Sequence, residues 1–182
     1  MLELAKYSAT EVLRDGQRIE VRALRPNDRT DLLAAVERVG PLSRYRRFFR
    51  SKRHLTDEEI AFFLNVDFVN HVALVAVAEE NGQPVIVGGS RYVIAHPGEA
   101  ELAFAVVDQY QGLGIGALML HHLIVIARAA GLRELTADVL SDNTPMLKVF
   151  QKCGLPLTTR RESQVTHLTL RLAEAQKQAQ SA

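Results

Sequence analysis

The spacing of apolar and polar residues changes along this chain between the periods of a strand and of a helix. These changes predict strands interspersed with helices. Residues 18–24 alternate charged and apolar side chains, which is typical of a half-exposed strand. Short apolar runs predict further strands at 71–79, 84–95, 100–107, 135–140 and 164–172. Helical spacing and capping residues predict four helices, which begin near 28, 56, 117 and 141. This order predicts an α/β protein with a mixed central sheet of about six to seven strands flanked by about four helices.

The pattern shows no internal repeat, no long linker and no second apolar core. We expect one domain over residues 18–172, preceded by an N-terminal segment or early strand over 1–17. Asp15-Gly16 is a hairpin signal at the end of that first segment. Residues 173–182 form a polar tail, rich in Ala and Gln, that fits either a helix or disorder. A length of 182 residues suits one domain with a substantial core.

Residues 100–131 organise the rest of the chain. A short apolar strand leads into a turn with Gly112, Gly114 and Gly116, and a long apolar helix follows that we expect to be buried. Backbone N–H groups at such a helix start have no helical partner, so the turn predicts a site for a phosphate or pyrophosphate. Neither a P-loop nor a Rossmann fingerprint fits, because the turn lacks Gly-Lys-Ser/Thr and a suitably placed acidic residue.

Composition excludes several other classes of protein. The chain is 47% hydrophobic and 24% charged, with a formal net charge of +1, so no overall field indicates nucleic acid. The single Cys153 fits a reducing compartment, and no segment resembles a signal peptide or membrane span. The six histidines form no ligand pattern, so we expect no metal. The prediction is a cytoplasmic protein with no nucleic-acid or membrane partner, and a homodimer is compatible with it.

Two motifs resemble the GNAT N-acetyltransferases. Gln-x-x-Gly-x-Gly after a strand resembles their acetyl-CoA pyrophosphate loop, and Ser141-Asp142-Asn143 before MLKVFQKCGL resembles their second signature. The resemblance covers about residues 18–172 and implies the GNAT fold with acetyl-CoA as co-substrate. It places the pyrophosphate on six consecutive residues, which are Gln111, Gly112, Leu113, Gly114, Ile115 and Gly116.

Four further segments resemble the Pat-type bacterial protein lysine acetyltransferases. They are RALRPND, LSRYRRFF, HVALVAV and AELAFAVVDQYQGLGIG. The resemblance implies acetyl transfer to a protein lysine, with an AMP-forming acyl-CoA synthetase as the first substrate to test. Two alternatives stay open: a small-molecule amine acceptor, and a non-catalytic acyl-CoA-binding regulatory module. This sequence carries neither the ligase nor the nucleotide-sensing domain of many Pat-type chains, so we expect no regulation through them.

Glu101 is the candidate general base. Only about one lysine amine in a few thousand is neutral at pH 7, so transfer needs a proton acceptor. Glu101 interrupts an apolar strand, and the Pat-type pattern places the family's catalytic glutamate there; Glu99 is the reserve. The alternative is that Glu101 lies near an exposed strand end and pairs with an arginine. In the GNAT fold the main chain of this strand aligns the pantetheine arm, here at Ala105, Val106 and Val107.

Other polar residues carry open alternatives. Phe150 stands where many GNAT enzymes have a tyrosine acid, and a thiol with a pKa near 8.5 leaves well without one. Cys153 is expected to be a packed side chain, and Asn143 either contacts the cofactor arm or caps its helix. The basic run from Arg44 to Arg53 is a solvated face, a docking surface for an acidic protein or the CoA 3′-phosphate, or, less favoured, a nucleic-acid contact.

Overall fold

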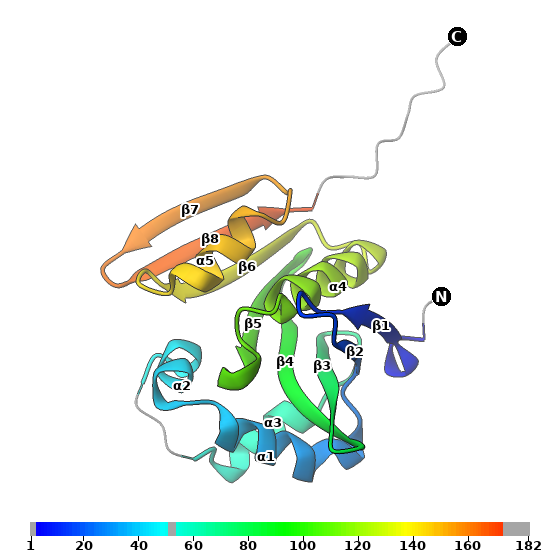
Figure 1. The fold of residues 1–182 in the computed structure, drawn as a ribbon. Helices are drawn as coiled ribbons and strands as arrows, with labels where there is room; N and C mark the ends of the chain where they lie inside the picture. Colours follow the sequence, from blue (N-terminus) through cyan, green and yellow to red (C-terminus); the bar gives the residue numbers. More distant parts are fainter. Residues whose placement is uncertain (1–2, 51–53, 173–182) are drawn as a thin grey trace.

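A computed structural model describes residues 3–50 and 54–172, which form one mixed sheet with helices on both faces (Figure 1). The strand order is β1-β2-β3-β4-β5-β6-β8-β7. The strands are β1 (Ser8–Val12), β2 (Arg18–Ala23), β3 (His71–Glu80), β4 (Gln83–His96), β5 (Glu99–Val106), β6 (Glu134–Leu140), β7 (Leu157–Glu162) and β8 (Val165–Arg171). The α-helices are α1 (Arg29–Arg38), α2 (Pro41–Phe48), α3 (Asp57–Leu64), α4 (Ile115–Ala129) and α5 (Thr144–Gln151).

The expected α/β class with a mixed sheet is confirmed, and the described residues contain more elements than the sequence pattern indicated. The early strand is present as β1, which pairs antiparallel with β2 across the hairpin at Asp15-Gly16. The pattern did not predict β7 or α2. The proposed tail at 173–182 lies outside the described residues.

The sheet divides between β5 and β6. Strands β1 to β5 form antiparallel ladders, and β6, β8 and β7 form another antiparallel group. The two groups meet in a parallel pairing of only three register pairs, from Glu99↔Glu134 to Glu101↔Thr136. Beyond Glu101 the two strands separate, and Figure 1 shows β5 and β6 diverging. The division leaves a gap in the middle of the sheet.

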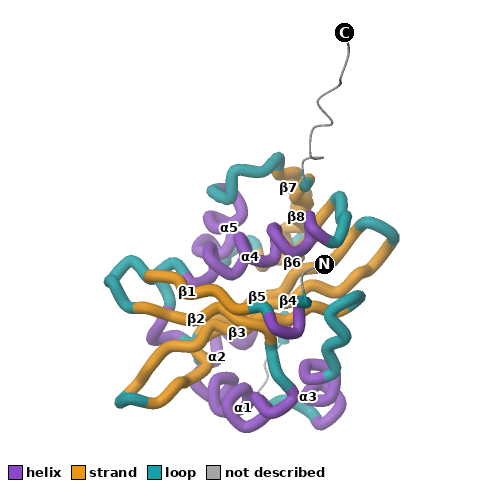
Figure 2. The backbone as a smooth tube through the Cα atoms, turned by 90° about the vertical axis from the view of Figure 1, so that its right-hand side faces the viewer, coloured by secondary structure: helices purple, strands orange, loops and turns teal. Residues whose placement is uncertain are grey.

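Helices cover the two faces of the sheet. Figure 2 shows α4 and α5 on one side, and α1 and α3 on the other. A Cβ atom built on Gly88 of β4 would lie 3.2 Å from Ile115 of α4, so this helix packs directly on the strand. Helix α4 is largely buried as expected, although one stripe with His121 and Val125 faces solvent. None of the described helices has the length and apolar character needed to cross a membrane.

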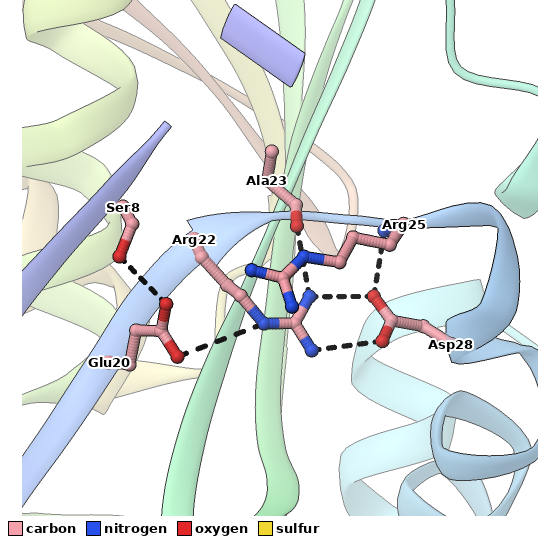
Figure 3. Close-up of polar contacts among 6 residues, drawn as sticks. All are labelled: Ser8, Glu20, Arg22, Ala23, Arg25 and Asp28. Atoms are coloured by element: carbon pink, nitrogen blue, oxygen red, sulfur yellow. Dashed lines mark hydrogen bonds and ion pairs between the residues drawn. The ribbon is translucent and has the colours of Figure 1, made fainter. Parts of the chain in front are cut away.

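The RALRPND segment forms a buried ion pair at the start of α1 (Figure 3). Arg22 donates from Nη1 to Asp28 Oδ2 at 2.7 Å and from Nη2 to Oδ1 at 2.9 Å. The backbone N–H of Arg25 donates to the same carboxylate at 2.7 Å. Burial opposes ionisation of Asp28, but these bonds and the arginine charges lower the pKa of Asp28 below its usual value. The pair fixes the end of β2 against α1.

Candidate active site

A cleft with a volume of about 420 Å³ opens where β5 and β6 separate. Its walls come from β5, β6, the glycine turn, α2 and α5. Glu101, Ala105, Val106, Gly116 and Asn143, all expected at the site from sequence, line this cleft. The cleft therefore brings together segments that are distant in the chain.

The β6-facing edge of β5 forms one wall of the cleft. Residues 102–106 pair with β4 on one side, while the register with β6 ends at Glu101 for the described part of the chain. Backbone groups of a strand edge are strong hydrogen-bonding groups when nothing pairs with them. Val107 lies beyond this wall: its N–H donates to Val87 O at 2.9 Å, and its side chain is buried. The edge can thus align an extended arm that carries amides.

The glycine turn forms one end of the cleft. Gly112 has φ 79° and Gly114 has φ 98°, values that favour glycine. Gly114 is the N-cap residue of α4, and as a glycine it has no side chain that could accept a hydrogen bond. The N–H groups in the first turn of α4 therefore have no N-cap side chain as acceptor. Gly116 lines the cleft, and a Cβ there would lie 3.7 Å from Val149. Ile115 is buried in the core, so only its main chain can serve a ligand.

Gln111 and Arg14 support the turn from two sides. The Gln111 amide donates to Ser43 Oγ at 3.0 Å and to Val106 O at 3.1 Å, so its side chain joins the turn to α2 and β5. Arg14, in the first hairpin, donates its N–H to Leu113 O at 3.2 Å and its Nη1 to Gly112 O at 3.4 Å. Arg14 places a cation beside the turn, and no motif in the sequence pointed to it.

Glu101 and Glu99 differ in their position relative to the cleft. Glu101 is exposed and lines the cleft at the last residue of β5 that pairs with β6. Glu99 lies two residues earlier, opposite Glu134, and does not line it. The charge of Glu101 partly opposes the lowering of the Arg47 pKa that burial causes. Of the two candidates, Glu101 is the one that faces the cleft.

Residues of α5 form the opposite wall. Asn143 is the N-cap of α5 and accepts the Met146 N–H at 3.4 Å, while it also lines the cleft. Phe150 is 1% exposed and meets Phe104 edge to face, with centroids 6.0 Å apart. Cys153 packs against the core, as expected, and does not line the cleft. Among the described lining residues there is no tyrosine or cysteine.

The basic run contributes side chains to the site rather than one solvated face. Arg46 and Arg47 of α2 line the cleft. Arg46 Nη2 donates to Asp142 O at 3.4 Å, and its buried Nε, 4.0 Å from Asp142 Oδ1, has no hydrogen-bond partner among the described residues. Arg50 pairs with Glu59 at 2.8 Å, away from the cleft. Residues 51–53 of the run lie outside the described residues. The sequence left the docking surface open as one alternative for this run, but it did not separate Arg46 and Arg47 from the other arginines.

The family model for the Acetyltransferase (GNAT) family matches residues 40–155. The chain belongs to the GNAT family of acetyltransferases. It is 31% identical over 162 residues to Acetyltransferase PA5475 of Pseudomonas aeruginosa, with 86% of each chain covered. It is 32% identical over 144 residues to Acetyltransferase Pat of Mycolicibacterium smegmatis, covering 78% of this chain and 42% of that longer one.

Solved GNAT structures agree in fold. The GNAT domain of S. lividans PAT superposes with a TM-score of 0.81 at 34% identity, covering 91% of this chain and 97% of that chain. YncA of Salmonella typhimurium, solved with its cofactor acetyl-CoA, shares the fold with a TM-score of 0.69 at 20% identity, covering 86% of this chain and 95% of that chain. The family model and these structures confirm the expected family, fold and enzyme class. GNAT acetyltransferases use acetyl-CoA.

The residues of this cleft fit acetyl-CoA. The unpaired edge at 102–106 suits the amides of pantetheine, and the α4 start suits its pyrophosphate. The buried Nε of Arg46, in the cleft wall, is a donor with no hydrogen-bond partner among the described residues, and Asp142 Oδ1 lies 4.0 Å from it. In contrast, no group of three or more His, Cys, Asp or Glu within residues 3–50 and 54–172 could hold a metal ion. His122, for example, is bonded to the Tyr7 hydroxyl through Nδ1 at 2.6 Å.

Proposed function

We propose that this protein transfers the acetyl group of acetyl-CoA to the side-chain amine of a protein lysine. Two similarities support a protein acceptor: the relative named Pat and the GNAT domain of S. lividans PAT, which matches over 91% of this chain. The observation that carries the reaction itself is Glu101, a carboxylate at the point where β5 leaves β6 inside the cleft. An AMP-forming acyl-CoA synthetase is the substrate class to test first.

Glu101 acts as the general base in this proposal. Acetyl-CoA supplies the thioester: as the amine nitrogen bonds to the acetyl carbon, the C–S bond breaks and sulfur keeps the electron pair as a thiolate. Glu101 accepts the proton that the amine loses, directly or through one water. Its exposure keeps this carboxylate hydrated and able to exchange the proton with solvent after each turnover. The transfer is direct, with no acyl-enzyme.

The remaining residues of the site bind and orient acetyl-CoA in this proposal. The β5 edge at 102–106 holds the arm in line, and the N–H groups at Gly114 and Gly116 hold phosphate oxygens at the α4 start. Arg14 adds positive charge beside the glycine turn, and Arg46 adds positive charge in the cleft wall. Phe150 donates no proton, so the thiol leaves as thiolate, which its ordinary pKa near 8.5 allows.

Glu101→Gln tests the assignment of the base. We expect kcat to fall by about 10²- to 10⁴-fold while the Kd for acetyl-CoA, measured by calorimetry, changes little. Glu99→Gln is the matched control, because it makes the same chemical change two residues away and outside the cleft. If Glu99→Gln lost activity and Glu101→Gln kept it, the base would be assigned to the wrong residue.

Mass spectrometry of a purified AMP-forming acyl-CoA synthetase, after incubation with this protein and acetyl-CoA, tests the acceptor. Acetylation of one or a few lysines, absent with Glu101→Gln, is the expected result. The second candidate acceptor is a small-molecule amine, favoured by the small pocket of about 80 Å³ that adjoins the cleft. Efficient turnover of a free amine with no modified lysine would replace the protein acceptor with this candidate.

A further inference from the structure

A small pocket of about 80 Å³ lies beside the cleft, on the face of the sheet covered by α1 and α3. It shares lining residues with the cleft, among them Arg47 and Ala103. Arginine provides all the charged side chains among its described lining residues, from Arg44, Arg47 and Arg91; the others are apolar or glycine. A pocket with this lining is unusual because a buried cation is costly without an anion.

Arg91 projects from β4 and is held in place by neutral groups. Its Nη1 donates to His71 Nε2 at 2.8 Å, and its guanidinium lies 4.4 Å from the ring centroid of Phe63. Burial, and then the charge of Arg47, lowers the pKa of Arg91 to about 9, so it is still a cation at pH 7. Burial and the charge of Arg91 also lower the pKa of His71, which keeps this imidazole neutral. Within residues 3–50 and 54–172, no carboxylate forms an ion pair with Arg91.

Arg47 enters the pocket from α2. It lies 4.9 Å from the ring centroid of Phe48 and 5.8 Å from that of Phe63. Burial lowers the pKa of Arg47, and the charges of Glu101 and Glu59 partly oppose this effect. Within residues 3–50 and 54–172, no hydrogen bond or ion pair joins its guanidinium to another residue. Two guanidiniums therefore share Phe63 and repel each other across the pocket.

Among the described residues, neither Glu59 nor Glu101 forms an ion pair with Arg47 or Arg91, although both charges favour the charged form of Arg47. Glu59 Oε1 accepts a bond from Arg50 at 2.8 Å, and its Oε2 accepts the N–H of Thr56 at 2.8 Å. Glu101 is exposed in the cleft, outside ion-pair distance of Arg47. A base that must accept a proton gains from having no tight ion pair, because such a pair would make it a weaker base. Arg47 and Arg91 thus have no ion-pair partner among the described residues, and an external anion can bind to them.

We propose that Arg47 and Arg91 bind a carboxylate that the acceptor carries close to its reacting amine. Guanidinium forks match a carboxylate in shape and bind it bidentately. Ala103 faces Arg91 across the β4–β5 ladder and Glu101 lies two residues earlier on the same face, a diagonal spacing of roughly 7–8 Å. The carboxylate then sits about one side-chain length from the base. It takes no part in bond making or breaking.

The proposal rests on the transfer reaction proposed above and narrows its acceptor. The carboxylate has two sources: an Asp or Glu side chain next to a target lysine, or the α-carboxylate of a free amino acid. Both place one negative charge near the reacting amine, and an acceptor without a carboxylate lacks this charge. The two sources are separated by the choice of acceptor in the experiment.

The experiment compares matched acceptors with acetyl-CoA as donor. One pair is a blocked peptide with lysine next to Glu and the same peptide with Gln; the other is leucine and leucinamide. We expect the wild type to favour the carboxylate form of at least one pair by about ten- to a hundredfold in kcat/KM. Arg91→Gln brings that ratio towards one, and Arg91→Lys restores it in part because the charge remains without the fork. Equal use of both members of both pairs would overturn the proposal.

Controls separate this proposal from the transfer reaction itself. Arg128→Gln, an exposed change on α4, should leave the ratio unaltered. If no acceptor is turned over, calorimetry of the Glu and Gln peptides in the presence of CoA still measures the site: the Glu peptide should bind about tenfold more tightly, and Arg91→Gln should remove the difference. A different result would disprove the acceptor site: the wild type uses succinyl-CoA far better than acetyl-CoA, and Arg91→Gln removes only this preference. Arg47 and Arg91 would then bind the carboxylate of the acyl donor.

Discussion

Glu101 and Thr136 form the last register pair between β5 and β6, and beyond them the sheet opens. The proposed base thus stands at the closed end of the gap, next to backbone groups that have no strand partner. A β5 that paired with β6 along its whole length would bury those groups and leave no room for the cleft. The short pairing is what allows this strand to provide both the base and the cofactor wall.

Replacing Gly116 tests the anion site without straining the backbone. Gly114 is a poor test position because its φ of 98° strains any side chain, whereas Gly116 is not in that region. Gly116→Glu should raise the acetyl-CoA Kd on the order of a hundredfold more than Gly116→Gln, because the two differ only in charge beside the phosphates. Calorimetry measures both variants, with circular dichroism as the check on folding. An equal loss in the two would place the phosphates elsewhere.

Asp28→Asn should destabilise the protein by about 3–5 kcal/mol, because it leaves the Arg22 charge buried and unpaired. Urea unfolding at pH 7 measures the loss. The matched control is Glu3→Gln, the same chemical change in an exposed pair with Lys6, which should cost at most about 1 kcal/mol. The pKa of Asp28 is lowered in the folded state, so its contribution is full above pH about 4 and lost on further acidification.

Phe150→Tyr asks whether the absent acid limits the rate. Phe150 is 1% exposed, so a hydroxyl that finds no partner there should cost about 1–3 kcal/mol of stability. We expect kcat to change by no more than about threefold, because the thiolate leaves without a proton donor. Steady-state kinetics and thermal unfolding check the two parts. A tenfold rise in kcat would show that proton delivery to sulfur limits the wild type.

His71 should make stability fall in mild acid. Burial and the Arg91 charge lower the pKa of His71 in the folded state, so the unfolded chain binds the proton more readily. Its contribution is therefore full above pH about 6.5 and decreases below it. His71→Gln should make the decline between pH 6.5 and 5 shallower in urea unfolding. His122 retains part of the dependence, since burial lowers its pKa in the same direction. An unchanged slope would contradict the assignment.

Local signals predicted the centre of the fold well and its edges less well. The strand, glycine turn and helix of residues 100–131 are encoded by short-range patterns, and they appear where expected. Helix α2 was not predicted because Gly40-Pro41 is typical of a helix end, whereas Pro41 here is also the first residue of the next helix. Strand β7 was missed because almost all its residues are exposed, which leaves no apolar alternation to recognise.

The candidate site shows the same limit. The glycine turn and Glu101 could be found from sequence because each belongs to one contiguous motif. Arg47 and Arg91 come from α2 and from β4, and their proximity depends on packing around Phe63. Each of the three interpretations of the basic run treated its residues together, yet its arginines diverge: Arg46 reaches Asp142 and Arg50 reaches Glu59. The side of α2 from which each arginine side chain projects, rather than the composition of the run, separates the roles of these arginines.

The division of the sheet also bears on self-association. A strand edge with unbonded N–H and C=O groups invites another chain to pair with it, and edges at the border of a sheet are where aggregation begins. The part of the β5 edge without a strand partner lies instead inside the cleft, between α2 and α5. A slender arm can reach it, but a second strand, with side chains on both faces, meets helix walls on either side. The backbone groups of this edge are thus accessible to a cofactor but not to a strand from another copy of the protein.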